Sequence, residues 1–213
     1  MSRYDRRRLA VVGAGVAGLT AAYVLQREAD VTLYEAADRL GGHADTHDVA
    51  APDGRPLEVD TGFIVLNRRT YPTLLRLFGE LGVQIQQSDM SMSISCAGCG
   101  LEYAGGRGLS GLLPSLRTSA RPAYLRMLTE VVRFHRRARA LLRTDDNATT
   151  LREFLAAGRF SPYFVAHFMT PLIAAVWSTA PTRTGDYPAR YLFTFLANHG
   201  MLTVTGAPTW YTV

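Results

Sequence analysis

Three glycines near the start of the chain have the spacing of a loop that binds the diphosphate of a dinucleotide. Gly13, Gly15 and Gly18 follow the apolar run Leu9-Ala-Val-Val and open a stretch with helical spacing that continues to about Gln26. The first glycine permits a tight strand-to-helix reversal, the second lets backbone approach a pyrophosphate, and the third lets the helix pack close to the strand. The phosphates would face a helix N-terminus, whose free N–H groups and positive dipole end favour anions.

An acidic residue completes this pattern. Glu35 ends a second apolar strand, Val31-Thr-Leu-Tyr, and lies about 20 residues after the glycines, where a carboxylate accepts hydrogen bonds from ribose hydroxyls. Because an acid repels a 2′-phosphate, NADP is the least suitable nucleotide. Strand, glycine loop, helix, strand and acid in this order indicate a nucleotide site. The alternatives are a glycine-rich turn without a ligand and a secretory signal with Arg6-Arg7-Arg8 as its charged region.

The residues after the acid narrow the choice of dinucleotide. Glu35-Ala-Ala-Asp-Arg39-Leu-Gly41-Gly42 resembles the Glu-x-x-x-Arg-x-Gly-Gly signature of the flavin-containing amine oxidoreductase superfamily, which includes amine oxidases, protoporphyrinogen oxidase and carotenoid desaturase-like enzymes. The resemblance implies FAD as the cofactor, with Glu35 at the adenosine ribose and Arg39 along the adenosine and pyrophosphate. It also implies that the backbone of Gly41 and Gly42 passes close to the phosphates and ribityl chain. His43 stands where many amine oxidases have arginine, which sets this chain apart from the best-known of them.

A second segment resembles the part of the superfamily that returns to the flavin. Asp60-Thr61-Gly62-Phe63-Ile64 would border the isoalloxazine with small residues and backbone amides, and a strand-end turn is the alternative. The predicted cofactor-binding residues are Gly13, Ala14, Gly15, Val16, Ala17, Gly18, Glu35, Ala36, Arg39, Gly41, Gly42, His43, Thr61, Gly62, Phe63 and Ile64. No catalytic residue and no metal ligand is predicted. Candidate neighbours of the flavin or of a substrate cavity are Trp177, Tyr191, Asn198 and His199.

The order of the predicted elements indicates an α/β fold. Residues 1–67 are predicted to form the N-terminal part of a Rossmann-like FAD- or NAD(P)-binding domain, and residues 68–213 a mostly helical, substrate-domain-like region. Within the second region we expect a helix over 71–82, a β-hairpin region over 83–103, and helices near 109–116, 123–142, 150–157, 162–177 and 188–198.

The predicted sheet is short of strands. An open parallel sheet built on one strand–helix–strand unit needs further strands to cover its edges, and enzymes of the superfamily return later in the chain to complete the flavin domain. We therefore expect a fragment that is incomplete at its C-terminus, with the missing C-terminal half as a partner. Three later segments resemble a bacterial, amine oxidase-like subgroup of predicted NAD/FAD-binding oxidoreductases: Trp177-Ser178-Thr179, Asn198-His199-Gly200 and residues 208–213.

Composition excludes several kinds of chemistry. All 23 basic residues are arginine, so the chain has no lysine that could form a Schiff base, anchor pyridoxal phosphate or serve in a Walker-type phosphate loop.

The overall composition indicates the class of protein. Its 47% hydrophobic and 19% charged residues are typical of a soluble globular protein. No uninterrupted apolar run reaches the roughly 20 residues of a spanning helix. Without a recognisable export signal, we expect a cytoplasmic protein.

Much of the net charge of +5 lies between Arg121 and Arg143. The residues that recur there at helical spacing, and so predict a buried stripe, are Leu125, Leu128, Val132, His135 and Leu142. The arginines expected mainly on another side are Arg126, Arg133, Arg136, Arg137 and Arg143. This basic face is either solvated or a surface for anionic lipid headgroups at a membrane. No nucleic-acid binding is expected, because no recognised binding module accompanies the charge.

The two cysteines of the chain, Cys96 and Cys99, form a Cys-x-x-Cys motif. A thioredoxin-like pair should open a helix after a strand, and a structural zinc site needs two further ligands. The flanking residues alternate in strand fashion around Ala97-Gly98, which favours a β-hairpin turn with reduced thiols over a redox or metal site.

Taken together, these features predict an FAD-dependent, amine oxidase-like oxidoreductase. It would transfer a hydride from a C–H bond of a small-molecule substrate to flavin N5. An FAD-dependent lipid or isoprenoid desaturase or isomerase is one alternative, and a non-catalytic nucleotide-binding module is another. The Arg39-Leu-Gly41-Gly42 extension argues against the third, an NAD-linked dehydrogenase.

Overall fold

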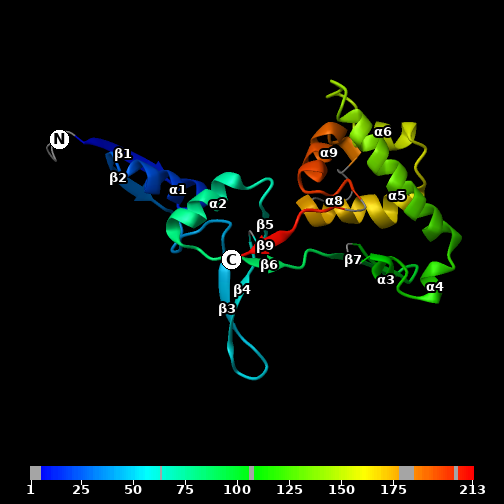
Figure 1. Cartoon of the computed structure of the whole chain (residues 1–213), viewed down its shortest axis with the longest axis horizontal. Coiled ribbons are helices and arrows are strands. Elements are labelled where there is room, and N and C mark those ends of the chain that lie inside the picture. Colours follow the sequence, from blue (N-terminus) through cyan, green and yellow to red (C-terminus); the bar gives the residue numbers. More distant parts are fainter. Residues whose placement is uncertain (1–5, 63, 106–107, 178–184, 204–205) are drawn as a thin grey trace. The chain divides into compact units, whose positions relative to one another are not determined.

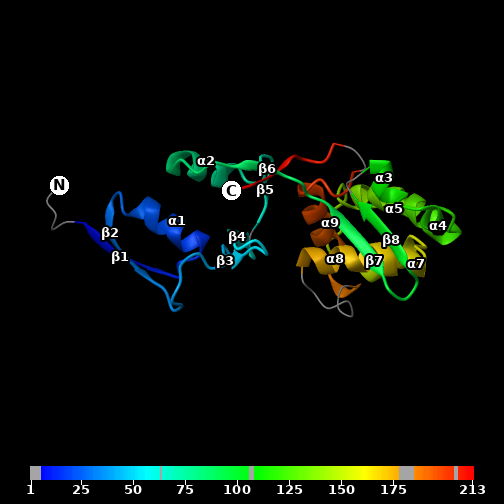
Figure 2. The ribbon, with the colours of Figure 1, turned by 90° about the horizontal axis from the view of Figure 1, so that it is seen from below.

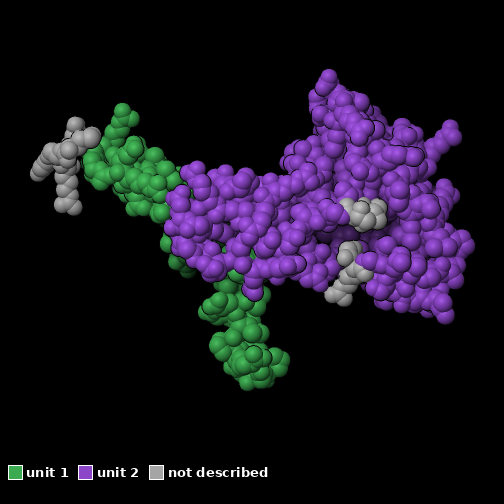
Figure 3. All heavy atoms as spheres, viewed as in Figure 1, with its two compact units in different colours: residues 1–65, 212–213 green, residues 66–211 purple. Residues whose placement is uncertain are grey.

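The computed structural model describes residues 6–62, 64–105, 108–177, 185–203 and 206–213. The chain divides into two compact units, one of residues 1–65 and 212–213 and the other of residues 66–211 (Figure 3). Within the described ranges, no helix has the length and apolar character needed to cross a bilayer.

The first unit begins with a parallel strand–helix–strand crossover. Strand β1 (Arg7–Val12) leads through helix α1 (Val16–Leu25) to strand β2 (Ala29–Tyr34) (Figure 1). The two strands pair in parallel, with Val12 opposite Tyr34 at their ends. A parallel pair requires such a crossover connection, so the predicted order of these three elements is confirmed. Both strands begin earlier than predicted, because backbone pairing continues through polar residues that the apolar pattern does not mark.

An antiparallel hairpin follows that the sequence pattern did not predict. Strand β3 (Thr46–Ala50) pairs with strand β4 (Pro56–Asp60), and Thr46 lies opposite Asp60. All residues of both strands are exposed, so the hairpin lacks the one-sided apolar alternation by which half-buried strands are recognised. Its register returns the chain after Asp60 to the residues that precede Thr46.

The second unit opens with a small sheet and a helix. Strands β5 (Leu66–Asn67), β9 (Trp210–Thr212) and β6 (Gln86–Ser88) form a sheet in the order β5-β9-β6. Helix α2 (Pro72–Leu81) confirms the helix predicted over 71–82, and it ends at Gly82, whose φ of 71° is left-handed. Glycine adopts this conformation at a helix end without the cost that a Cβ would bring.

A second hairpin joins this part of the chain to the helices. Strand β7 (Met92–Cys96) pairs with strand β8 (Leu101–Gly105), and Ile94 lies opposite Tyr103. The predicted hairpin turn around Ala97-Gly98 is confirmed. Side chains on one face of the hairpin are buried in the same apolar core as the helices, and Figure 2 shows the hairpin beside them.

The helical core is arranged around one phenylalanine. The helices after the hairpin are α3 (Gly108–Leu112), α4 (Leu116–Ser119), α5 (Pro122–Leu141), α6 (Leu151–Ala157), α7 (Pro162–Phe164), the π-helical turn η2 (Val165–Met169), α8 (Thr170–Trp177) and α9 (Ala189–Asn198). Phe134 of α5 is fully buried. Five phenylalanine rings from four other helical elements and a loop lie with their centroids within 6.3 Å of its own: Phe154, Phe160, Phe164, Phe168 and Phe193. Most of these pairs meet edge to face, a favourable arrangement for aromatic rings.

The buried side of α5 differs from the predicted stripe. Leu125 and Val132 are 45% and 57% exposed, so their prediction as core residues was wrong. The buried residues are Tyr124, Met127, Glu130, Phe134, His135 and Ala138. Glu130 is an acidic residue within this buried side, and its carboxylate accepts hydrogen bonds from the backbone N–H and hydroxyl of Ser161 at 3.0 and 2.5 Å. These bonds, and an ion pair with Arg133 at 3.2 Å, compensate its burial.

We expect Phe134→Ala to lower the free energy of unfolding by about 3–5 kcal/mol, because it leaves a cavity and removes the ring contacts at the centre of the core. Urea unfolding followed by tryptophan fluorescence measures the change. Leu125→Ala on the exposed side of α5 is the matched control, and its effect should be well below that of Phe134→Ala. Equal losses in the two variants would contradict this orientation of α5.

The buried histidine of α5 makes stability depend on pH. Burial, with a smaller contribution from the charge of Arg139, lowers the pKa of His135 to about 4. The unfolded chain therefore binds this proton near pH 6.5, whereas the folded chain binds it only near pH 4. The contribution of the neutral, buried His135 to the free energy of unfolding is therefore complete above about pH 6.5, and it falls as the pH drops toward 4. We expect His135→Leu to flatten this part of the stability–pH curve, measured by urea unfolding at several pH values, and parallel curves would exclude the assignment.

Candidate functional site

The predicted glycine loop forms the turn between β1 and α1. Gly13 has a left-handed φ of 91°, and its N–H donates to the Tyr34 carbonyl oxygen at 2.7 Å, which keeps the two strands paired up to the turn. Gly15 is the N-cap residue of α1, and in the described part of the chain no side chain caps this helix. Val16 and Ala17 begin the helix with exposed side chains. Their turn has the unpaired N–H groups and dipole end that bind anions.

Two glycines of this region are required by close backbone contacts. A Cβ on Gly18 would lie 1.8 Å from the Gly13 carbonyl oxygen, and a Cβ on Gly42 would lie 2.9 Å from the Gly15 Cα. Gly41 forms a β-bridge with Gly15 and has a φ of 111°. Gly41 and Gly42, the second glycine pair, therefore pack backbone to backbone on the glycine loop that runs from Gly13 to Gly18.

The carboxylate of Glu35 is hydrogen-bonded to this loop. One oxygen accepts from the Ala14 N–H at 2.6 Å, and the other accepts from the N–H groups of Ala36 and Ala37 at 2.7 and 2.9 Å. The bond from Ala37 contributes most to a lowered pKa of Glu35, followed by those from Ala14 and Ala36, and Arg39 adds to it. The group is therefore ionised at neutral pH. A carboxylate has about four acceptor positions, so capacity remains for one further donor.

Arg39 braces the second glycine pair. Its guanidinium donates to the Gly42 carbonyl oxygen at 2.8 Å and lies 3.2 Å from a carboxylate oxygen of Asp45. Asp45 also lies 3.1 Å from the His47 imidazole. The sequence analysis did not identify Asp45, because it falls outside the signature and no spacing marks it.

The β3–β4 hairpin carries a second predicted segment back to the same loop. The Thr61 N–H donates to the Asp45 carbonyl oxygen at 2.8 Å, and the Thr61 hydroxyl donates to the same oxygen at 3.1 Å. A Cβ on Gly62 would lie 1.8 Å from the His43 carbonyl oxygen. The structure thus brings the glycine loop, Glu35, the second glycine pair and Thr61-Gly62 together within one unit.

The side chains of the remaining predicted cofactor-binding residues are largely exposed where the structure describes them. Ala36 and His43 have exposed side chains. Ile64 is 48% exposed, and its carbonyl oxygen accepts a hydrogen bond from the Thr212 hydroxyl at 2.9 Å. Phe63 lies outside the described residues.

Four further candidates lie in the second unit, and three of them, Trp177, Tyr191 and His199, take part in ring contacts. Trp177 stacks on Tyr191 with centroids 5.5 Å apart, and Phe195 stacks on His199 at 4.0 Å. Asn198 is exposed at the end of α9. Phe195 was not predicted, although its spacing of four residues from both Tyr191 and His199 on one helix is the signal that identifies it.

Comparison with known proteins places this arrangement in a family. The profile of the family described as flavin containing amine oxidoreductase matches residues 16–206. The chain belongs to this family. Its cofactor is FAD, so the family and the cofactor inferred from Glu35, Arg39 and the second glycine pair are confirmed. As ligands of the cofactor, the individual residues stay predictions.

Two relatives of this chain have different substrates in their names. Coproporphyrinogen III oxidase of Mycobacterium tuberculosis is 40% identical over 85 residues, which cover 38% of this chain and 18% of that protein. L-amino-acid oxidase of Pseudechis australis is also 40% identical over 85 residues, which cover 39% and 16% of the two chains.

The fold is shared with a solved amine oxidase. A wild-type putrescine oxidase bound to putrescine matches 98% of this chain with a TM-score of 0.64 and 19% sequence identity. This likeness confirms the predicted α/β fold class of the FAD-dependent amine oxidases. The chain spans 46% of the putrescine oxidase chain.

We expect Gly18→Ala to destabilise the turn between β1 and α1 by about 1–3 kcal/mol, because the new methyl group would overlap a backbone carbonyl. Hydrogen exchange of peptides from residues 9–25 should become faster. Gly79→Ala is the matched control, since a Cβ there meets no atom within 4 Å and alanine favours a helix by up to about 1 kcal/mol. Unchanged exchange in Gly18→Ala would contradict the close packing.

Proposed function

We propose that this chain binds the adenosine diphosphate portion of FAD and forms part of an amine oxidase-like oxidoreductase. The observation that carries the proposal is the contact between the two glycine turns, which leaves the N-terminus of α1 uncapped beside an ionised carboxylate. Membership of a flavin-containing family supports FAD rather than NAD. The acid at Glu35 disfavours a 2′-phosphate, as in NADP.

Each part of the site has one task in this proposal. The first-turn N–H groups of α1 bind the pyrophosphate, where the helix dipole favours negative charge. Glu35 accepts a hydrogen bond from an adenosine ribose hydroxyl through its remaining acceptor position. Arg39 holds the second glycine pair against the loop and adds positive charge beside the phosphates. The absence of side chains at Gly15 and Gly42 lets backbone and cofactor approach each other.

Bound FAD supplies a hydride acceptor at flavin N5, which allows oxidation of a substrate C–H bond. The chain's contribution is to bind and orient the cofactor. Its relatives are named for coproporphyrinogen, L-amino acids and putrescine, and this diversity supports a small-molecule substrate without selecting one of them.

We expect the purified chain to bind FAD, and Glu35→Ala to weaken binding roughly ten- to hundredfold through loss of a charge-assisted hydrogen bond. Quenching of flavin fluorescence in a titration at fixed salt measures the affinity. Gly15→Val should abolish binding by filling the approach to the pyrophosphate. Glu58→Ala, an exposed acid on β4 of the same unit, is the matched control and should bind like the wild type.

Three results would count against the proposal. Unchanged FAD affinity in both Glu35→Ala and Gly15→Val would remove the site assignment. Binding of NAD in preference to FAD would favour a dehydrogenase. A well-folded chain that binds neither dinucleotide would favour a non-catalytic interaction module.

A further inference from the structure

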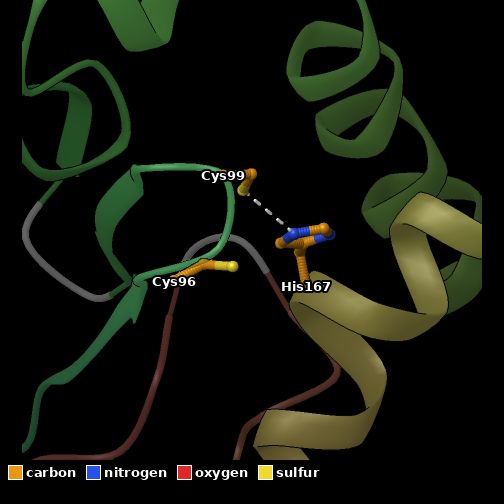
Figure 4. A group of neighbouring side chains, drawn as sticks. All are labelled: Cys96, Cys99 and His167. Carbon is orange, nitrogen blue, oxygen red and sulfur yellow. Dashed lines mark hydrogen bonds between the residues drawn. The ribbon is translucent and has the colours of Figure 1, made fainter.

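The hairpin cysteines meet a histidine from a distant part of the chain. The Sγ atom of Cys99 lies 3.3 Å from Nε2 of His167, which is 68 residues away in the sequence. The Sγ of Cys96 joins them, and all three atoms lie within 4.8 Å of one another. Both cysteines are free thiols. Figure 4 shows the three side chains pointing into one space from the hairpin turn and from η2.

The hairpin turn holds the two cysteines close together. Cys96 is the last residue of β7, and its backbone pairs with Leu101 of β8 across the turn. Gly100 closes the turn with a left-handed φ of 65°, and its N–H donates to the Cys96 carbonyl oxygen at 2.7 Å. This closed turn fixes the backbone that carries both cysteines, so their sulfur atoms stay near each other.

The histidine is held with its other nitrogen toward the sulfurs. Nδ1 lies 3.1 Å from the Tyr163 carbonyl oxygen, and the imidazole stacks on the Tyr163 ring with centroids 4.1 Å apart. When Nδ1–H donates to this carbonyl, Nε2 presents its lone pair to the cysteines. Metal-binding histidines are oriented in the same way, by a hydrogen bond from the nitrogen that does not bind the metal.

A proline and a tyrosine fix the backbone at this point. Pro171 has no N–H, so it cannot donate a hydrogen bond to the preceding turn. The His167 carbonyl oxygen instead accepts a hydrogen bond from the Tyr103 hydroxyl at 2.7 Å. Because Tyr103 is on β8, this bond ties the cysteine hairpin directly to η2. Single π-helical turns are frequent at functional sites.

The donor atoms suit zinc. Two thiolates from a Cys-x-x-Cys and one imidazole are a common set for this ion, which prefers tetrahedral coordination. With Zn–S near 2.3 Å and Zn–N near 2.05 Å, tetrahedral ligands are separated by about 3.6 Å for S···N and about 3.8 Å for S···S. The observed 3.3 Å between Cys99 and His167, and the limit of 4.8 Å for the whole group, need only small side-chain rotations to match.

We propose that Cys96, Cys99 and His167 bind one zinc ion, with water as the fourth ligand. Within the described ranges no further histidine, cysteine or acidic side chain joins the group as a fourth protein ligand. Zinc sites with three protein ligands keep an open position that water can occupy. The ion links the β7–β8 hairpin to η2. The site is independent of the dinucleotide loop, which lies in the other unit.

The test uses the full chain, purified with a phosphine reductant and without chelator. Elemental analysis should find about one zinc per chain, the stoichiometry of a single three-ligand site. After the zinc is replaced by Co²⁺, a thiolate-to-cobalt charge-transfer band and intense visible bands should report a four-coordinate site with sulfur ligands. Cys99→Ser should lose the charge-transfer intensity, and His167→Gln should weaken zinc binding at least about tenfold in competition with a chromophoric chelator.

Matched variants separate this site from other zinc binding. Ser95→Ala on β7 and His47→Gln in the other unit should retain full zinc content, and so should Glu35→Ala, whatever it does to FAD binding. A chelator should lower the melting temperature of the wild type but not that of Cys99→Ser. The wild-type cobalt spectrum keeps the proposal testable even if a variant fails to fold.

Three results would disprove the zinc site or its ligands. A wild-type chain that contains no zinc and shows no charge-transfer band with added Co²⁺ would disprove the site. Zinc retained at full affinity by Cys99→Ser or by His167→Gln would disprove these ligands. A chain that binds no zinc and that, when purified without reductant, forms a Cys96–Cys99 disulfide found by mass spectrometry would identify a redox pair instead.

Discussion

Contact between two turns that lack side chains organises the first unit. The backbone at Gly42 approaches Gly15 more closely than any Cβ would permit, and Gly18 is similarly close to the carbonyl of Gly13. These approaches fix the path of the chain from β1 into α1 and from β2 into the following hairpin. They also decide where Glu35 lies, since its carboxylate accepts hydrogen bonds from the loop itself. The chemistry of this unit thus depends on backbone geometry more than on any single functional side chain.

Arginine side chains of α5 both cover the aromatic core and form an ion pair. The Arg133 guanidinium lies 4.6 Å from the centroid of the Phe160 ring, and that of Arg137 lies 5.9 Å from the Phe154 ring. A planar guanidinium stacks on aromatic faces and forms ion pairs at its edge, which an ammonium group does less well. In a chain without lysine, part of the basic surface of α5 therefore also covers the aromatic core, and Arg133 neutralises the buried Glu130 at the same time.

The sequence was sufficient where chemistry and structure are local. From Gly13 to Glu35 each signal follows the last within one crossover, so order along the chain fixes position in space. Arg39, Gly41 and Gly42 follow directly, and with them family, cofactor and fold class could be inferred. The burial or role of a residue could not be predicted where it depends on a partner far away in the sequence. The burial of Glu130 is compensated by Ser161, which lies 31 residues away and donates two hydrogen bonds to it. His167 gains significance only beside Cys99, and no periodicity on its own helix shows what approaches from the hairpin.

The π-helical turn makes the helix that contains it sensitive to chain length. Such a turn holds one residue more than an α-helical turn, and each residue of an α-helix advances the direction of side chains by about 100°. Loss of one residue from Val165–Met169 would restore regular winding and rotate everything that follows. Leu172 and Ile173, now buried, would then turn away from the core. In evolution, deletions at this point should therefore be rarer than substitutions. Homologous sequences should keep the same number of residues here even where the residue types differ.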